Sequence, residues 1–318
     1  MSRRWLAAVG ALAYGGAMIG FGLSNSFTML FAAAFVWGAA SDAFVHGCEV
    51  ALVDLAGDDL PRMIGRVNAW SALGDLLAPL TLALAAGFGF GWRGVFLAGG
   101  GLMLVYGLWL ASQRFPPPHE RPDDAAPALD LLALITDGRV LLMAVIMGLF
   151  ALLDEPLLAF LIAYLDGIAG YGPGLAVMLS ASALVGGLAG HSLAGRLIPA
   201  ATPTHVLAPA ALATAISLPV MAFSPQAWLV VAGGLAFGFS GAVFYTALQS
   251  LVLTLRPGQA GSTGAVVSAI GLAGAGFPAL VGWAADAWGL AAGLGLYVAV
   301  PTAMLALTLV LGRGRGRG

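Results

Sequence analysis

The sequence has no lysine, a single cysteine and few charged residues of either sign. Of its 318 residues, 9% are charged and 60% are hydrophobic, and the mean hydropathy is +0.95. A soluble domain carries about 25% charged residues, so this chain has too little charge to cover a surface that faces water. The composition excludes a cytosolic enzyme, a nucleic-acid-binding protein and a disordered chain, and it favours a polytopic helical membrane protein.

The same absences exclude several chemistries. A chain without lysine cannot form a Walker A motif, so ATP hydrolysis is not expected. Cys48 cannot form a disulfide framework by itself, and we interpret it as a small packed side chain. We find neither a nucleophile elbow nor a zincin motif, and no metal-ligand cluster surrounds His46. We therefore predict a protein that is not an enzyme and that uses no cofactor and no metal.

Long apolar stretches dominate what is present. About 20 apolar residues cross a bilayer as a helix. Ten stretches qualify, at residues 5–23, 27–50, 67–87, 92–112, 140–165, 173–194, 205–223, 227–252, 262–284 and 289–311. The first is too long for the core of a signal peptide, so we interpret it as a retained helix. The one long connection, 112–139, contains three consecutive prolines among polar residues and is typical of a linker.

The arginines indicate how the chain is oriented in the membrane. With the N-terminus in the cytoplasm, 12 of the 13 arginines fall on the cytoplasmic side and Arg93 falls outside. Cytoplasmic segments of membrane proteins carry such an excess of positive charge. We therefore predict a multi-pass protein of the inner or plasma membrane, with both termini in the cytoplasm.

An internal repeat relates the two ends of the chain. A shift of 200 residues aligns Gly38 with Gly238, and it also aligns the order of the spans, the turns and the loop lengths. Spans one to four are thus repeated as spans seven to ten in the same orientation. Because Met1 aligns with Ala201, the simplest interpretation is a 6+6 architecture without its first two helices. A natural ten-span protein is the alternative.

Two short motifs are informative. Gly65 and Gly74, followed by Ala78-Pro79, resemble the antiporter motif of the major facilitator superfamily, with Ala78-Pro79 in place of its Gly-Pro pair. Small residues let helices approach closely and proline bends a helix, so generic small-residue packing is the alternative. Residues 190–196 resemble the family's loop motif in the C-terminal half, with a glycine at its acidic position.

The ten stretches, the repeat and this resemblance together predict an all-α polytopic membrane protein of ten transmembrane helices in two pseudo-symmetric bundles (4+6). Residues 1–112 would form an N-terminal bundle of four helices, equivalent to helices three to six of the family. Residues 113–139 would form a cytoplasmic linker, and 140–318 a C-terminal bundle of six helices.

Titratable side chains inside predicted spans are the candidate functional residues. A charged side chain there costs about 2.5–3.5 kcal/mol, so each must face water or a partner. The six candidates for substrate binding and proton coupling are Asp154, Glu155, Asp42, Asp75, His46 and Glu49. Uncharged candidates for lining a cavity are Asn68 and three residues on the repeat-equivalent face of span eight, Tyr245, Thr246 and Gln249.

Two groups of these residues have informative spacing. Asp42, His46 and Glu49 share one helical face, either as a proton-titratable stripe or as a local ion pair. Asp154 and Glu155 are adjacent and precede Pro156, which loosens the helix. Two neighbouring carboxylates raise each other's pKa, which suits proton exchange, although a buried structural pair is the alternative.

Asp75 shares a face with Asn68 and Ser71. It could be a coupling site, or it could be the centre of a set of hydrogen bonds between helices.

The resemblance implies a secondary active transporter of a small organic solute that works by alternating access. Acidic residues without an intramembrane arginine favour a cationic or neutral amphipathic solute, with protons as the coupling ion. The antiporter-like motif slightly favours efflux. The expected partners are the solute, protons and the lipid bilayer, with no nucleic acid. The alternative is a truncated, non-transporting membrane remnant or binding subunit of the same fold.

Overall fold

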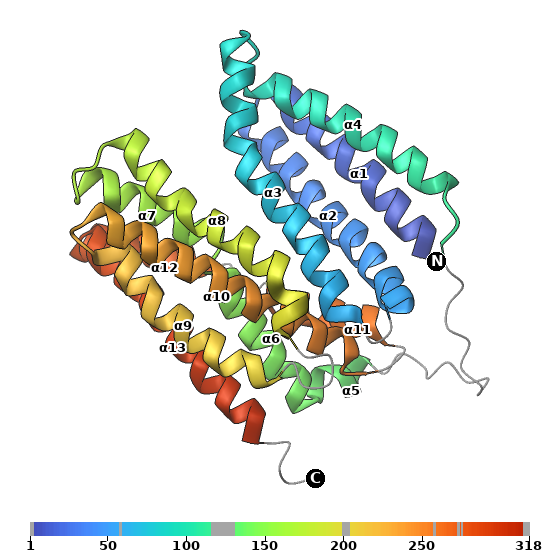
Figure 1. Ribbon diagram of the computed structural model, residues 1–318. Helices are drawn as coiled ribbons and strands as arrows, with labels where there is room; N and C mark the ends of the chain where they lie inside the picture. Colours follow the sequence, from blue (N-terminus) through green and yellow to red (C-terminus); the bar gives the residue numbers. More distant parts are fainter. Residues whose placement is uncertain are drawn as a thin grey trace. The chain divides into compact units, whose positions relative to one another are not determined.

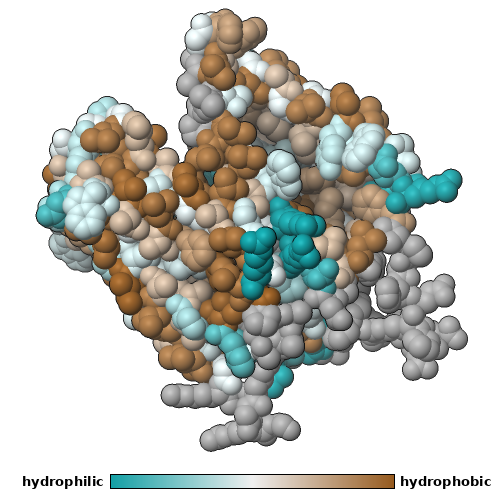
Figure 2. All heavy atoms as spheres, viewed as in Figure 1, coloured by the Kyte–Doolittle hydropathy of each residue, from teal (hydrophilic) through white to brown (hydrophobic). Residues whose placement is uncertain are grey.

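The structure is a computed structural model that describes residues 3–56, 59–115, 131–198, 204–256, 259–271, 274 and 276–313. Every regular element in these ranges is a helix, which confirms the predicted all-α class. Eight helical segments of the described chain are long and apolar enough to cross a membrane. Hydrophobic side chains cover most of the helix surface visible in Figure 2, as is expected where helices face lipid.

The predicted count of ten spans is not confirmed. The predicted third span lies in α3 (Leu60–Gly87), which is continuous but is not among the eight segments. The predicted ninth span is divided into α11 (Ala260–Gly271) and α12 (Phe277–Trp288). At 1.5 Å per residue, 12 residues extend about 18 Å, which is less than the hydrocarbon core of a bilayer.

The contacts divide the chain into two compact units. Unit 1 comprises Met1–Gly57 and Leu77–Ala126, and unit 2 comprises Asp58–Leu76 and Pro127–Gly318. The division falls inside α3, so the first half of this helix groups with unit 2 and the rest with unit 1. The predicted bundle boundaries at 112 and 140 stay a prediction.

In unit 1, α1 (Arg3–Leu23) packs against both α2 (Phe27–Ala56) and α4 (Trp92–Ser112) (Figure 1). Small residues permit this: a Cβ at Gly10 would lie 2.6 Å from the backbone nitrogen of Phe44. In the short connection between α1 and α2, Ser26 Oγ accepts a hydrogen bond of 3.2 Å from Met29 N. Such a side-chain cap satisfies a backbone donor at the start of a helix.

Unit 2 holds the remaining helices in full. They are α5 (Leu131–Thr136), α6 (Gly138–Ala151), α7 (Glu155–Gly167), α8 (Pro173–Leu197), α9 (Thr204–Phe223), α10 (Ala227–Thr254), α11, α12 and α13 (Leu290–Arg313). Helix α10 packs against α8 and α9, and α9 also packs against α13. The pairing of α9 with α10 and α13 parallels that of α1 with α2 and α4, in agreement with the predicted repeat.

Candidate functional site

The predicted fifth span is interrupted at its two adjacent carboxylates. Helix α6 ends at Ala151, and α7 begins at Glu155 with Pro156 in its first turn. Proline has no backbone N–H and its fixed φ suits the first turn of a helix, so Pro156 favours a new start here. At this interruption, Leu153 N donates a hydrogen bond of 2.9 Å to Phe150 O, three residues earlier. The turn is therefore tighter than an α-helical turn, in which the bonded residues are four apart.

This interruption presents both carboxylates at the surface of the chain. Asp154 is the N-cap residue of α7 and makes no side-chain cap hydrogen bond, and both it and Glu155 are exposed. A helix N-terminus carries a partial positive charge that stabilises a carboxylate in the first turn. In transporters, interrupted helices of this kind supply groups that bind solutes and coupling ions. The arrangement is suited to exchanging a proton or binding a cationic group.

A second interruption lies beside the first within unit 2. Helix α11 ends at Gly271, and α12 begins at Phe277. A Cβ at Gly148 of α6 would lie only 3.0 Å from Gly271 Cα, and one at Gly274 would lie 3.5 Å from Leu152 Cδ2. The end of α6 and the end of α11 therefore meet almost backbone to backbone. Sequence reasoning treated 262–284 as one span and missed this contact, although the glycine-rich run after Ile270 is a signal for it.

The predicted stripe on α2 lies in unit 1. His46 Nδ1 and Glu49 Oε2 are 2.9 Å apart, and both side chains are half-buried. Asp42, one turn earlier, is exposed. The geometry fits the predicted common face and supplies the local pair that was considered as an alternative for His46 and Glu49. A role for the three residues in coupling stays a prediction.

The uncharged candidates lie in unit 2 and contact one another or neighbouring side chains. Asn68 Nδ2 donates to Gln249 Oε1 at 3.0 Å. Thr246 Oγ1 lies 3.0 Å from His191 Nδ1, and the ring of Tyr245 meets the His191 ring edge to face. Thr246 is fully buried and Gln249 is 8% exposed. That these residues line a solute path stays a prediction.

Sequence reasoning did not select His191 of α8 as a candidate. The structure shows that it contacts two of the predicted cavity residues through its Nδ1 and its ring. The 55 positions between His191 and Thr246 hide this contact from any local pattern. Asp75 lies exposed on α3.

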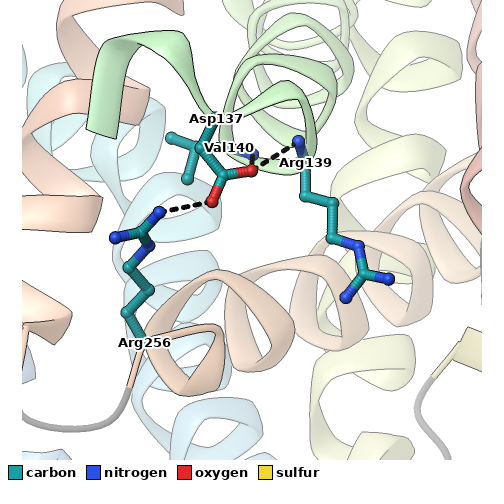
Figure 3. Close-up of polar contacts among 4 residues, drawn as sticks. All are labelled: Asp137, Arg139, Val140 and Arg256. Atoms are coloured by element: carbon teal, nitrogen blue, oxygen red, sulfur yellow. Dashed lines mark hydrogen bonds and ion pairs between the residues drawn. The ribbon is translucent and has the colours of Figure 1, made fainter. Parts of the chain in front are cut away.

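An ion pair ties the start of α6 to the end of α10 (Figure 3). Asp137 Oδ2 accepts a hydrogen bond of 2.6 Å from Arg256, and Oδ1 accepts one of 2.8 Å from Arg139 N. The hydrogen bond from Arg256, followed by the backbone donors of the helix start, holds the pKa of Asp137 below its usual value. Sequence reasoning could not predict this ion pair, because a partner 119 residues away leaves no local signal.

Within the described ranges, no group of three or more His, Cys, Asp or Glu side chains is placed to hold a metal ion.

The comparisons with known proteins agree on the fold. A family model described as the Major Facilitator Superfamily matches residues 1–278. The human organic anion transporter MFSD10 (TETRAN) is similar in structure, with a TM-score of 0.73 and 17% identity over 96% of this chain and 77% of that one. The Escherichia coli fucose:proton symporter FucP superposes with a TM-score of 0.75 and 16% identity over 100% of this chain and 85% of that one. No curated protein matches significantly.

Proposed function

Since the chain belongs to the Major Facilitator Superfamily, we propose that it is a secondary active transporter of a small organic solute that works by alternating access. Members of this family are transporters rather than enzymes, and the resemblance inferred from the motifs is confirmed. The chain is a multi-pass membrane protein of this family.

We propose that protons drive transport through Asp154 and Glu155. The observation that carries this proposal is the interruption between α6 and α7, which leaves both carboxylates exposed at the start of a helix. A carboxylate at membrane depth is costly unless it reaches water or a partner. If protonation favours one conformation and solute binding favours the other, the difference in affinity between the two states drives the cycle.

The solute we propose is cationic or neutral and amphipathic. The spans contain acidic side chains but no arginine near their middle, so a positive group has a partner there and an anion does not. The two similar structures are described as transporters of organic anions and of fucose with protons, so likeness in fold does not choose among solutes. The antiporter-like motif at Gly65 and Gly74 is the basis for preferring efflux.

The test is transport in reconstituted vesicles after a pH jump, with a panel of cationic, neutral and anionic compounds. We expect Asp154→Asn and Glu155→Gln each to reduce proton-driven flux by about tenfold, within the range typical of coupling energies. Asp166→Asn, further along α7, is the matched control and should retain wild-type flux. Wild-type flux in both site variants would show that the coupling residues lie elsewhere.

We also propose that the chain lies in the inner or plasma membrane with both termini in the cytoplasm, on the basis of the arginine distribution. Cysteines added at each terminus of a Cys48→Ser protein should resist a membrane-impermeant thiol reagent in intact cells. They should react once the cells are opened. Labelling of either terminus in intact cells would overturn the proposed orientation.

A further inference from the structure

Three arginines lie where the start of α3 meets the end of α8. Arg62 and Arg66 belong to the first two turns of α3, and Arg196 belongs to the last turn of α8. The two helix ends touch, because a Cβ on Gly195 would lie 2.8 Å from Arg62 Cα. Both segments belong to unit 2, so the three guanidinium groups share one end of a pair of contacting helices.

These arginines have no acidic partner. All three are exposed, and in the part of the chain that the structure describes none of them forms an ion pair. Arg256, by contrast, is paired with Asp137. Asp59, just before α3, is exposed and is not paired with Arg62. Because guanidinium groups match the oxygens of a phosphate in shape and charge, the arrangement favours a bound phosphate group.

Exposed apolar side chains lie one turn from the arginines, toward the middle of each helix. Trp70 follows Arg66 by four residues and is 74% exposed, and Leu193 precedes Arg196 by three residues and is 38% exposed. Residues three or four positions apart lie on the same face of a helix. Each helix therefore presents a cationic group near its end and an apolar group further in, in the order of the head group and acyl chains of a phospholipid.

The arginines lie on a side of the helix pair that is turned away from α10. Asn68 bonds a side chain of α10, and Arg66, two residues earlier, lies on nearly the opposite side of α3, since a helix has 3.6 residues per turn. On α8, Ala194 is fully buried beside Gly65, whereas Arg196, two residues later, is exposed. The packing of α8 and α10 against α3 thus leaves these two arginines open to a ligand.

We propose that Arg62, Arg66 and Arg196 bind the phosphate of an anionic phospholipid whose acyl chains lie along Trp70 and Leu193. Basic pockets between membrane helices bind lipid head groups in this way. A free phosphate ion has the same head-group chemistry, but it would leave the two apolar side chains without a ligand. The proposal depends on the chain being a membrane protein and not on its proposed transport activity.

Lipid binding to the full-length protein in detergent tests the site. The protein is titrated with phosphatidylglycerol or with phosphatidylcholine, and bound lipid is counted by native mass spectrometry. Phosphatidylglycerol should bind at least about tenfold more tightly, because only this lipid carries a net negative charge. Arg62→Gln and Arg196→Gln should each lower its affinity about fivefold, and the further addition of Arg66→Gln should abolish the preference. Arg139→Gln, at an exposed arginine of α6, is the matched control and should bind as the wild type does.

Three results would overturn the lipid site. The first is equal affinity of the wild-type protein for the two lipids. The second is an unchanged preference in the variant that lacks all three arginines. The third is displacement of phosphatidylglycerol by inorganic phosphate at the same concentration, which would show that the arginines take a free phosphate ion.

Fluorescence quenching tests the position of the acyl chains with every arginine in place. Lipids with brominated acyl chains are added at the same low fraction to phosphatidylcholine nanodiscs, and the difference between wild type and Trp70→Phe gives the quenching of Trp70. Brominated phosphatidylglycerol should quench Trp70 at least about twofold more than brominated phosphatidylcholine does. Trp228 of α10, which is 68% exposed, is the control and should respond equally to both lipids. Equal quenching of Trp70 by the two lipids would refute the proposed lipid position.

Discussion

Asp137 and Arg256 form an ion pair with an N–O distance of 2.6 Å, and this pair fixes the start of α6 against the end of α10. The same carboxylate caps α6, because its second oxygen accepts from the backbone nitrogens of Arg139 and Val140. One side chain thereby performs a local task that the sequence suggests and a long-range task that it does not.

Replacing Asp137 should separate these two tasks. Asparagine is as good a helix cap as aspartate, so Asp137→Asn should lower the free energy of unfolding by less than about 1 kcal/mol, the range of exposed ion pairs. Asp137→Ala loses the cap as well and should cost about 1 kcal/mol more. The unfolding free energies of the two variants are measured in detergent micelles, with Asp166→Asn as the control. Equal effects of the two substitutions would contradict the capping role.

The ion pair also predicts a dependence on pH. Because the pKa of Asp137 is lowered in the folded protein, its contribution is present above the unfolded pKa and is lost as pH falls through the folded pKa. The stability difference between wild type and Asp137→Asn should therefore shrink on acidification below about pH 4. A difference that grows in acid would mean that another group is responsible.

The close contact between α6 at Gly148 and the end of α11 at Gly271 leaves no room for a larger side chain. Gly148→Ala places a Cβ 3.0 Å from Gly271 Cα, and we expect a loss of about 1–3 kcal/mol in unfolding free energy, typical of overpacking. Gly282→Ala on α12 is the matched control, because a Cβ there meets nothing within 4 Å. It should be neutral or slightly stabilising, since alanine favours helices. Equal stability of the two variants would contradict the close approach.

Asn68 and Gln249 should be coupled energetically. Each change to alanine removes the hydrogen bond between the two amides, so Asn68→Ala and Gln249→Ala should each cost about 1 kcal/mol in unfolding free energy. The double variant should cost less than their sum by about 0.5–1 kcal/mol. Pairing Asn68→Ala with Ser240→Ala, whose hydroxyl bonds Thr214, supplies an additive control. Additivity in the Asn68–Gln249 pair would show that their hydrogen bond contributes nothing.

The stripe on α2 gives a prediction that distinguishes its members. Asp42 is exposed, whereas His46 and Glu49 already contact each other. If the stripe takes part in coupling, Asp42→Asn should lower proton-driven flux about fivefold. Asp286→Asn, an exposed carboxylate near the end of α12, is the control. Unchanged flux in Asp42→Asn would leave this face with a structural role alone.

The sequence by itself determined the helical class, the membrane environment and most helix positions. These follow from local properties: the length of an apolar run, the turn at Ser26 and the proline after Glu155 all act within a few residues. The weakness of the helix at Asp154 was therefore predictable, because Pro156 removes a backbone donor wherever the rest of the chain lies.

Only the tertiary structure decided which of these residues have partners. Gly65 and Gly74 are two glycines of one motif, yet an added Cβ would clash with a neighbouring helix at Gly65 and meet open space at Gly74. Asn68 and Gln249 are 181 positions apart, and no periodicity relates them. Helix packing brings such residues together, and packing depends on the shapes of whole helices rather than on any short stretch of sequence.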